Sequence, residues 1–324
     1  MHTYFETPPD DARSPAQRAA LRRSLKVLRR SVASWEAAWQ NAGFDTLVLN
    51  ENDANIFPNF TALRKAYAAY PTVNRASVEV PCHSRYAAMA ARGGGWMSDV
   101  DVFPALFAKD WPAAANKAHV TLYQRHVPGL VSGTARAFAN AANDLANLPF
   151  KERTDIFTEQ GRPHVSDMHG MLYLLQSKGA HAHPCQRVVP AKDVLGVGPS
   201  LHCDAFRPSA KCGGPRTLAA HCSHHDFYEL RGKNASSVAV DASVLASTVD
   251  VFLQAATPLA DIVEDCCLNA TANGTNPARA CRLAAAPQAA PRARPPNAHP
   301  MFPWLLLGVL CSLAAIWRRP YALY

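Results

Sequence analysis

Residues 84–104, SRYAAMAARGGGWMSDVDVFP, predict a helix, a tight turn and a buried strand in immediate succession. Residues 85–91 are rich in alanine, the best helix former. Gly93, Gly94 and Gly95 end this predicted helix, because glycine adopts the left-handed backbone of a helix C-cap without a Cβ clash. Residues 96–98 then form a short apolar strand. This succession of a helix and a buried strand favours an α/β fold.

An acidic pair, Asp99 and Asp101, follows the carboxyl end of the predicted strand. In open α/β sheets, ligands bind beyond the carboxyl ends of the strands. We expect an extended Asp-x-Asp segment to point both carboxylates to one side, since side chains alternate along a strand. Two such oxygen ligands can share Mg²⁺ or Mn²⁺ with phosphate oxygens. The same pattern also occurs in solvated loops, so the prediction of a site depends on the helix and strand that precede the acidic pair.

Short apolar strands alternate with helices along the rest of the chain, which favours a mixed, mostly parallel sheet with flanking helices. The 324 residues are 48% hydrophobic and 18% charged, enough to bury a core and unlike a disordered or fibrous chain. One domain is expected over residues 1–282. The predicted strands are residues 46–49, 96–98, 120–123, 187–189 and 217–221, and the predicted helices are residues 15–40, 59–67, 85–91, 134–145, 167–175 and 243–254.

The end of the chain has the composition of a linker followed by a membrane anchor. Residues 283–300 are dominated by Ala and Pro and are predicted to be a linker. Residues 301–317 carry no charge and would span about 25 Å as a helix. Trp304 and Trp317 lie at its two ends, where interfacial aromatic residues are expected. We therefore expect a C-terminal transmembrane helix rather than a buried core helix, followed by a short tail, 318–324.

The net charge of +8 suggests an anionic partner. Basic residues gather on the predicted helix 15–40 and near the end of the chain, however, and no nucleic-acid-binding motif is present. We therefore expect a nucleotide diphosphate and no nucleic acid. The His and Cys residues between 178 and 222 lack the paired spacing of a zinc site. In an oxidising compartment, disulfides such as Cys203–Cys212 or Cys266–Cys281 are expected instead.

Residues 84–104 resemble the donor-binding segment of GT-A glycosyltransferases, in particular the group that contains the initiating outer-chain mannosyltransferases. In that group an Arg-Tyr pair on a helix precedes a Gly-Gly turn and a strand that ends in D-x-D. The matching residues here are Arg85, Tyr86, Gly93, Gly94, Asp99 and Asp101. Weaker likenesses extend over residues 2–230: residues 2–6 are similar to the first strand, 34–54 to a helix and second strand, 128–133 to a loop that faces the sugar, and 219–230 to a His-containing strand end.

The resemblance implies a metal-dependent hexosyltransferase that moves a hexose from a UDP- or GDP-sugar to a hydroxyl of a glycan, glycoprotein or glycolipid. A retaining reaction is implied, in which the leaving diphosphate deprotonates the acceptor. The implied cofactor is Mn²⁺ or Mg²⁺. Its implied ligands are Asp99, Asp101 and His221, whose neutral imidazole suits Mn²⁺. The implied donor contacts are Arg85, Tyr86, Asp99, Tyr4, Ser132 and Gly133.

Several of these residues also have a purely structural interpretation. Asp167 would hydrogen-bond sugar hydroxyls or act as the base of an inverting enzyme, but it also lies at a predicted helix start beside Ser166. Tyr4 fits a packed core, and a single histidine such as His221 is usually a satisfied structural residue. The competing hypothesis for the whole protein is a non-catalytic, membrane-tethered module with a degenerate GT-A fold.

The expected location is the Golgi or ER membrane, with the catalytic domain in the lumen. Four N-x-S/T sequons, at Asn59, Asn234, Asn269 and Asn273, support a lumenal domain. The chain opens with MHTYFETPPDD, however, which has no apolar signal region. A cytosolic, tail-anchored topology is therefore the alternative.

Overall fold

The computed structural model describes residues 1–6, 29, 31–74, 76–104, 118–183, 188–190, 208–209, 214–215 and 219–221. The predicted linker 283–300, anchor 301–317 and tail 318–324 lie outside these residues, as do the predicted helix 243–254 and the cysteines of the expected disulfides. Within the described part of the chain, no helix is both long and apolar enough to cross a membrane.

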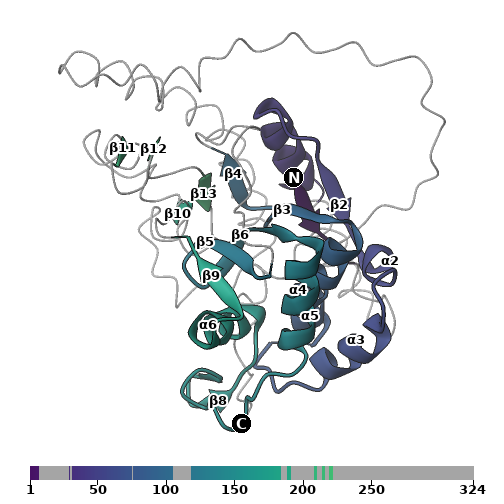
Figure 1. Ribbon diagram of the computed structural model, residues 1–324, viewed down its shortest axis with the longest axis vertical. Coiled ribbons are helices and arrows are strands. Elements are labelled where there is room, and N and C mark those ends of the chain that lie inside the picture. Colours follow the sequence, from purple (N-terminus) through teal and green to yellow (C-terminus); the bar gives the residue numbers. More distant parts are fainter. Residues whose placement is uncertain are drawn as a thin grey trace, which may run out of the picture.

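A six-stranded sheet with the strand order β2-β1-β3-β6-β5-β9 forms the centre of the fold (Figure 1). Its strands are β1 (His2–Tyr4), β2 (Leu47–Leu49), β3 (Gly94–Ser98), β5 (Val120–Gln124), β6 (Val127–Thr134) and β9 (Ala180–Ala182). Strand β1 pairs in parallel with β2 and β3, and β5 with β9. Only β6 runs antiparallel to its neighbours, β3 and β5. The predicted α/β class with a mostly parallel sheet is thus confirmed.

Helices cover one face of this sheet, where α4 and α5 lie side by side (Figure 1). The helices are α2 (Glu51–Ala54), α3 (Phe60–Ala68), α4 (Ala76–Ala91), α5 (Ala135–Leu145) and α6 (Asp167–Ser177). Met97 of β3 and Val131 of β6 point into this core, where they pack with Ala87 and Phe138 from the helices.

The opposite face packs against helical residues 31–41 and a small sheet with the order β10-β13-β4. Trp35 and Trp39 are fully buried there, beside Trp96 and Leu130 of the central sheet. The small sheet consists of β10 (Val188–Pro190), β13 (Ala219–His221) and β4 (Val102–Pro104). Two short pairs complete the described strands: β7 (Thr158–Glu159) with β8 (Arg162–Pro163), and β11 (Pro208–Ser209) with β12 (Gly214–Pro215).

Two elements differ from the sequence prediction. The helix predicted over 85–91 begins at Ala76 and contains Pro81, because burial of residues 79–84 compensates for a sequence of low helix propensity. Residues 128–133 form most of strand β6, so their interpretation as a loop was wrong. Pro and Gly suggested a loop, but Leu130 and Val131 are buried on opposite faces of the sheet.

The carboxyl ends of β1, β2, β3, β5 and β9 lie along one edge of the sheet, because these strands are parallel. Asp99 leaves the sheet at this edge directly after β3, and Gln124 ends β5 there. Strand β6 begins at the same edge, because it runs the other way. The polar side chains that follow the strands are therefore brought together from separate parts of the chain.

Candidate functional site

Arg85 on α4 joins two carboxylates that come from different elements. Its Nη1 donates to Oδ1 of Asp99, and its Nη2 donates to Oδ2 of Asp167. Asp99 leaves β3 on the helical face, on the same side as Met97, and Asp167 is the first residue of α6 after the N-cap Ser166. The structure therefore brings together three of the predicted site residues. We call this group the Arg85 clamp.

The Arg85 clamp is nearly closed to solvent, with side-chain exposures of 4% for Arg85, 16% for Asp99 and 7% for Asp167. Burial disfavours the charge on Arg85, but the Asp167 and Asp99 carboxylates raise its pKa above the ordinary value. Burial raises the pKa of Asp99, and the carboxylate of Asp101 adds to that effect while Arg85 opposes it. When all three groups are charged, the clamp has a net negative charge, which attracts a cation or a ligand bound to one.

Asp101 contacts the small sheet through His221. The backbone N–H of Val102 donates to the carbonyl of Asp99 at 3.1 Å, which closes a turn directly after β3. Asp101 Oδ2 lies 3.4 Å from His221 Nε2 on β13, whose register places His221 opposite Val102. The expectation of an extended Asp-x-Asp segment was wrong, because the chain turns there to enter β4, and the two carboxylates contact different partners, Arg85 and His221.

Two site residues, Gln124 and Gly129, were missed from the sequence. Gln124 Nε2 donates to His221 Nδ1 at 2.9 Å, and the carbonyl of Gly129 accepts from the Asp99 N–H at 2.9 Å. A Cβ at Gly129 would lie only 2.7 Å from Gln124 Oε1. The one signal in the sequence was Gln124 itself, a polar residue at the end of an apolar strand, and such residues are common in proteins.

The fit to a divalent cation rests on Asp101 and His221. Among the described residues, no group of three or more His, Cys, Asp or Glu side chains is placed to hold a metal ion. Asp101 and His221 offer one oxygen and one nitrogen, a set that Mn²⁺ accepts. Gln124 Oε1 is buried and makes no hydrogen bond. If the amide turned over, this oxygen would accept the His221 Nδ1–H and direct Nε2 to a metal, the usual outer-shell arrangement.

The remaining predicted donor-binding residues lie in packed surroundings. Tyr86 is fully buried, with the Arg85 guanidinium carbon 5.5 Å from its ring centroid. Tyr4 is buried in the same core and donates its hydroxyl to Glu6. Ser132 hydrogen-bonds the Tyr123 hydroxyl at 2.9 Å.

The strand register separates Ser132 and Gly133 from the acidic pair. They lie opposite Trp96 and Gly95 in the first half of β3, whereas Asp99 follows its end. The structure thus places Tyr86 against Arg85 and Tyr4 in the core, and it places Ser132 and Gly133 away from the acidic pair.

No known protein family, curated protein or solved structure matches this chain. Its class is therefore defined by the fold and the site alone. It is a mixed α/β protein whose mostly parallel sheet presents a buried Arg–carboxylate clamp and an Asp–His pair at its carboxyl edge.

Proposed function

We propose that the protein is a metal-dependent glycosyltransferase with a GT-A-like fold, which moves a hexose from a UDP- or GDP-sugar to a hydroxyl acceptor. The observation that carries the proposal is the place of Asp99 and Asp101, directly after β3 at the carboxyl edge of the sheet. GT-A enzymes of the group resembled place an Arg-Tyr pair on the helix before such a strand. Here Arg85 and Tyr86 lie on α4, and Arg85 binds Asp99.

The roles of the residues follow from their contacts. Asp101 and His221 would hold Mn²⁺ or Mg²⁺, which, when bound, would neutralise the charge of the leaving diphosphate. Arg85 fixes the orientation of Asp99, which would meet the ribose or a metal-bound water. Gln124 orients the His221 ring through Nδ1. The partners are thus a nucleotide-sugar donor and a glycan or lipid acceptor.

The proposed reaction exchanges one bond at the anomeric carbon of the sugar. The bond from this carbon to the diphosphate oxygen breaks, and a bond to the acceptor oxygen forms. In a retaining enzyme the acceptor proton passes to the departing phosphate oxygen, so that no protein base is required. Asp167 is the candidate base for an inverting reaction, but its buried carboxylate is bound to Arg85. This contact favours a positioning role, in which Asp167 and Asp99 together fix the guanidinium.

The test is a panel of UDP- and GDP-sugars incubated with the full-length protein and Mn²⁺, scored by released nucleoside diphosphate. We expect release from at least one donor, and loss of that release in Asp101→Asn. Asp155→Asn is the matched control, because Asp155 is exposed and pairs with Arg153 at the surface. Release that persists in Asp101→Asn would refute the metal role.

The competing proposal is a non-catalytic, membrane-tethered module with a degenerate GT-A fold. It is favoured by one observation, that the described residues contain no group of three metal-binding side chains. A panel in which no donor releases its nucleotide would support this alternative over the enzyme.

The proposed location is the Golgi or ER membrane, with the α/β domain in the lumen and residues 301–317 as the anchor. Cys82 is disulfide-bonded, which suits an oxidising compartment. Asn59, in the sequon Asn59-Phe60-Thr61, is exposed at the start of α3 and makes no capping hydrogen bond with its side chain. A cytosolic, tail-anchored topology is the alternative.

A further inference from the structure

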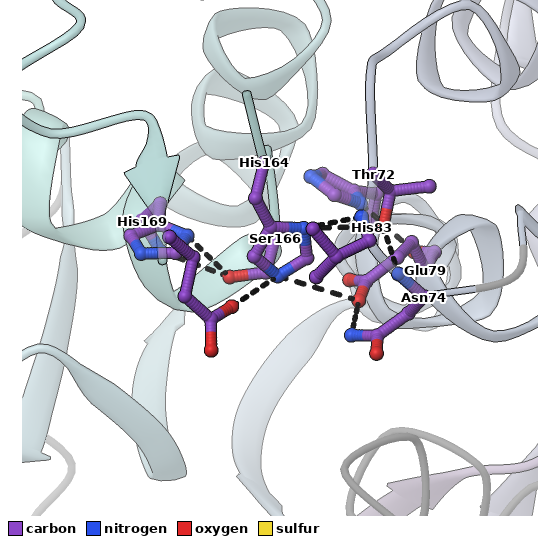
Figure 2. A network of polar contacts seen from close by, with 9 residues as sticks. Thr72, Asn74, Glu79, His83, His164, Ser166 and His169 are labelled. Carbon is purple, nitrogen blue, oxygen red and sulfur yellow. Dashed lines mark hydrogen bonds and ion pairs between the residues drawn. The ribbon is translucent and has the colours of Figure 1, made fainter. Parts of the chain in front are cut away.

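A second polar network lies where α4 and α6 begin, and its Ser166 directly precedes Asp167 of the Arg85 clamp. Figure 2 shows its side chains. Its members come from the segment before α4, from α4 itself, from the β7–β8 hairpin and from the start of α6. They are Thr72, Asn74, Glu79, His83, Glu159, His164, Ser166 and His169. Figure 2 shows His164 between Ser166 and His169 on one side and Glu79 and Asn74 on the other. We call this group the Glu79–His164 network.

The hydrogen bonds of His164 determine which ring nitrogen carries its proton. The backbone N–H of Val73 lies 3.3 Å from Nδ1 and can only donate, so Nδ1 is an acceptor. The Thr72 hydroxyl lies 3.1 Å from the same atom. The proton is therefore on Nε2, which lies 3.2 Å from Glu159 Oε2 and 3.9 Å from Glu79 Oε1. His164 thus connects the segment before α4 with Glu159, and its Nε2 faces the Glu79 carboxyl group at a distance too long for a hydrogen bond.

This network and the Arg85 clamp link α4 to α6 twice. Glu79 and Arg85 both belong to α4; Glu79 faces His164, just before α6, and Arg85 binds Asp167 in its first turn. The Ser166 hydroxyl caps α6 by accepting from the His169 N–H at 3.3 Å. A shift of residues 164–166 would therefore move Asp167 relative to Arg85.

We propose that Glu79 and His164 are positioning residues, which hold the first turn of α6 against α4 and so keep Asp167 on Arg85. The consequence for the donor site, through Arg85 and Asp99, rests on the proposed function. The positioning itself rests only on the contacts described above.

The positioning depends on pH, because Glu79 titrates close to neutrality. Burial raises the pKa of Glu79 from 4.5 to about 8; the hydrogen bond from Asn74 opposes this, and the charges of Asp167 and Glu159 add to it. The folded protein thus keeps the Glu79 proton up to about pH 8, whereas the unfolded chain releases it near pH 4.5. Stability is therefore lost as the pH rises between these two values.

The groups that face Glu79 give an ionised carboxylate little compensation. Asp167 on α6 and Glu159 on β7 are acidic. His83, one turn further along α4, is neutral, because burial lowers its pKa and its Nδ1–H donates to the Glu79 carbonyl at 2.8 Å. Burial also lowers the pKa of His169. Arg85 is bound by Asp99 and Asp167, so it does not offset the repulsion that Asp167 and Glu159 exert on an ionised Glu79. Ionised Glu79 therefore loosens the start of α6.

The experiment is hydrogen exchange of the full-length protein, with protection factors measured for peptides that cover residues 164–171. The measurements are made at about pH 6.5 and about pH 9, on either side of the Glu79 pKa of about 8. We expect wild-type protection of the first turn of α6 to fall at the higher pH. Glu79→Gln keeps the acceptor for Asn74 but cannot ionise, so its protection should stay constant. Glu152→Gln, at an exposed position, is the matched control and should behave like wild type.

Equal loss of protection in wild type and Glu79→Gln, or constant protection in wild type, would overturn the proposal. If Glu79→Gln does not fold, Thr72→Val serves instead. Thr72→Val removes the hydroxyl that contacts His164 Nδ1, so it should lower protection of the first turn of α6 at both pH values. Unchanged protection in Thr72→Val would also overturn the proposal. Mn²⁺-dependent binding of UDP and GDP is measured in parallel. If hydrogen exchange changes with pH as expected but neither UDP nor GDP binds, the proposed function alone is refuted. If a nucleotide binds but protection of α6 does not change with pH, this inference alone is refuted.

Discussion

Arg85 is the residue on which the candidate site depends most, because it satisfies two buried carboxylates at once. A planar guanidinium can donate to Asp99 and Asp167 in separate directions, whereas the ammonium of lysine is a compact point charge. The fully buried Tyr86 ring packs beside it. The arrangement is therefore specific to arginine rather than to positive charge.

Arg85→Lys should accordingly destabilise the fold, since one buried carboxylate loses its partner. The loss of one member of a buried ion pair costs about 3–5 kcal/mol, measured as the free energy of unfolding in urea. Arg153→Lys is the control, because Arg153 pairs with Asp155 at the surface, and it should change stability little. Equal stability of the two variants would contradict the buried clamp.

The residues of the site were more predictable than their directions. Asp99 and Asp101 were identified because the helix, glycines and strand before them are local in sequence. Their different partners were not predictable, because Asp101 meets His221, which comes from a distant strand. Gln124 and Gly129 were missed for the same reason: Gln124 acts through His221, which is remote in sequence, and Gly129 through a backbone carbonyl that carries no side-chain signal.

At the scale of elements, the turn from α4 into β3 depends on glycine for two different reasons. Gly93 and Gly94 both have positive φ, at 90° and 81°. A Cβ at Gly93 would meet no atom within 4 Å, whereas one at Gly94 would lie 2.5 Å from the backbone of Thr134 and Ala135. The second glycine therefore permits β3 to start directly against the end of β6.

Gly94→Ala should destabilise the protein much more than Gly93→Ala. Gly93→Ala has only the strain of the left-handed backbone, about 1–3 kcal/mol. Gly94→Ala adds a clash with backbone atoms, which cannot move aside as a side chain can. Urea unfolding of the two variants measures this difference, and equal losses would show that the close approach of β3 to α5 is not tight.

Helix α4 and strand β6 show why element boundaries escaped prediction. Residues 76–84 include Pro81 and buried polar side chains, so local propensity did not indicate a helix. Pro128 and Gly129 suggested a loop, whereas the two cores on either side of the sheet stabilise a strand there. In both cases tertiary burial outweighed the local preference.

At the scale of the whole molecule, the α/β class followed from the alternation of strands and helices, but the strand order did not. The order depends on pairings such as β3 with β6, which join distant segments. The same non-local pairing gathers the site from α4, β3, β5, β6, α6 and β13. A sequence can indicate which residues carry chemistry, but the sheet decides which of them meet.

The proposed lumenal location predicts an N-glycan on Asn59, because this exposed asparagine begins a sequon on the folded surface. The full-length protein made in eukaryotic cells should gain mobility when its N-glycans are enzymatically removed. Asn59→Gln should reduce that shift, and Asn147→Gln, at an exposed asparagine outside any sequon, should not. Absence of a glycan at Asn59 together with a free Cys82 thiol would favour the cytosolic alternative.

The most direct test of the central claim is calorimetric binding of UDP and GDP to the full-length protein, with and without Mn²⁺. If Asp101 and His221 hold the cation at the donor site, one of the nucleotides binds only with Mn²⁺. Asp101→Asn then weakens that binding by about tenfold or more, while Asp155→Asn binds like wild type. Failure of both nucleotides to bind in the presence of Mn²⁺, or equal affinity of wild type and Asp101→Asn, would contradict the account.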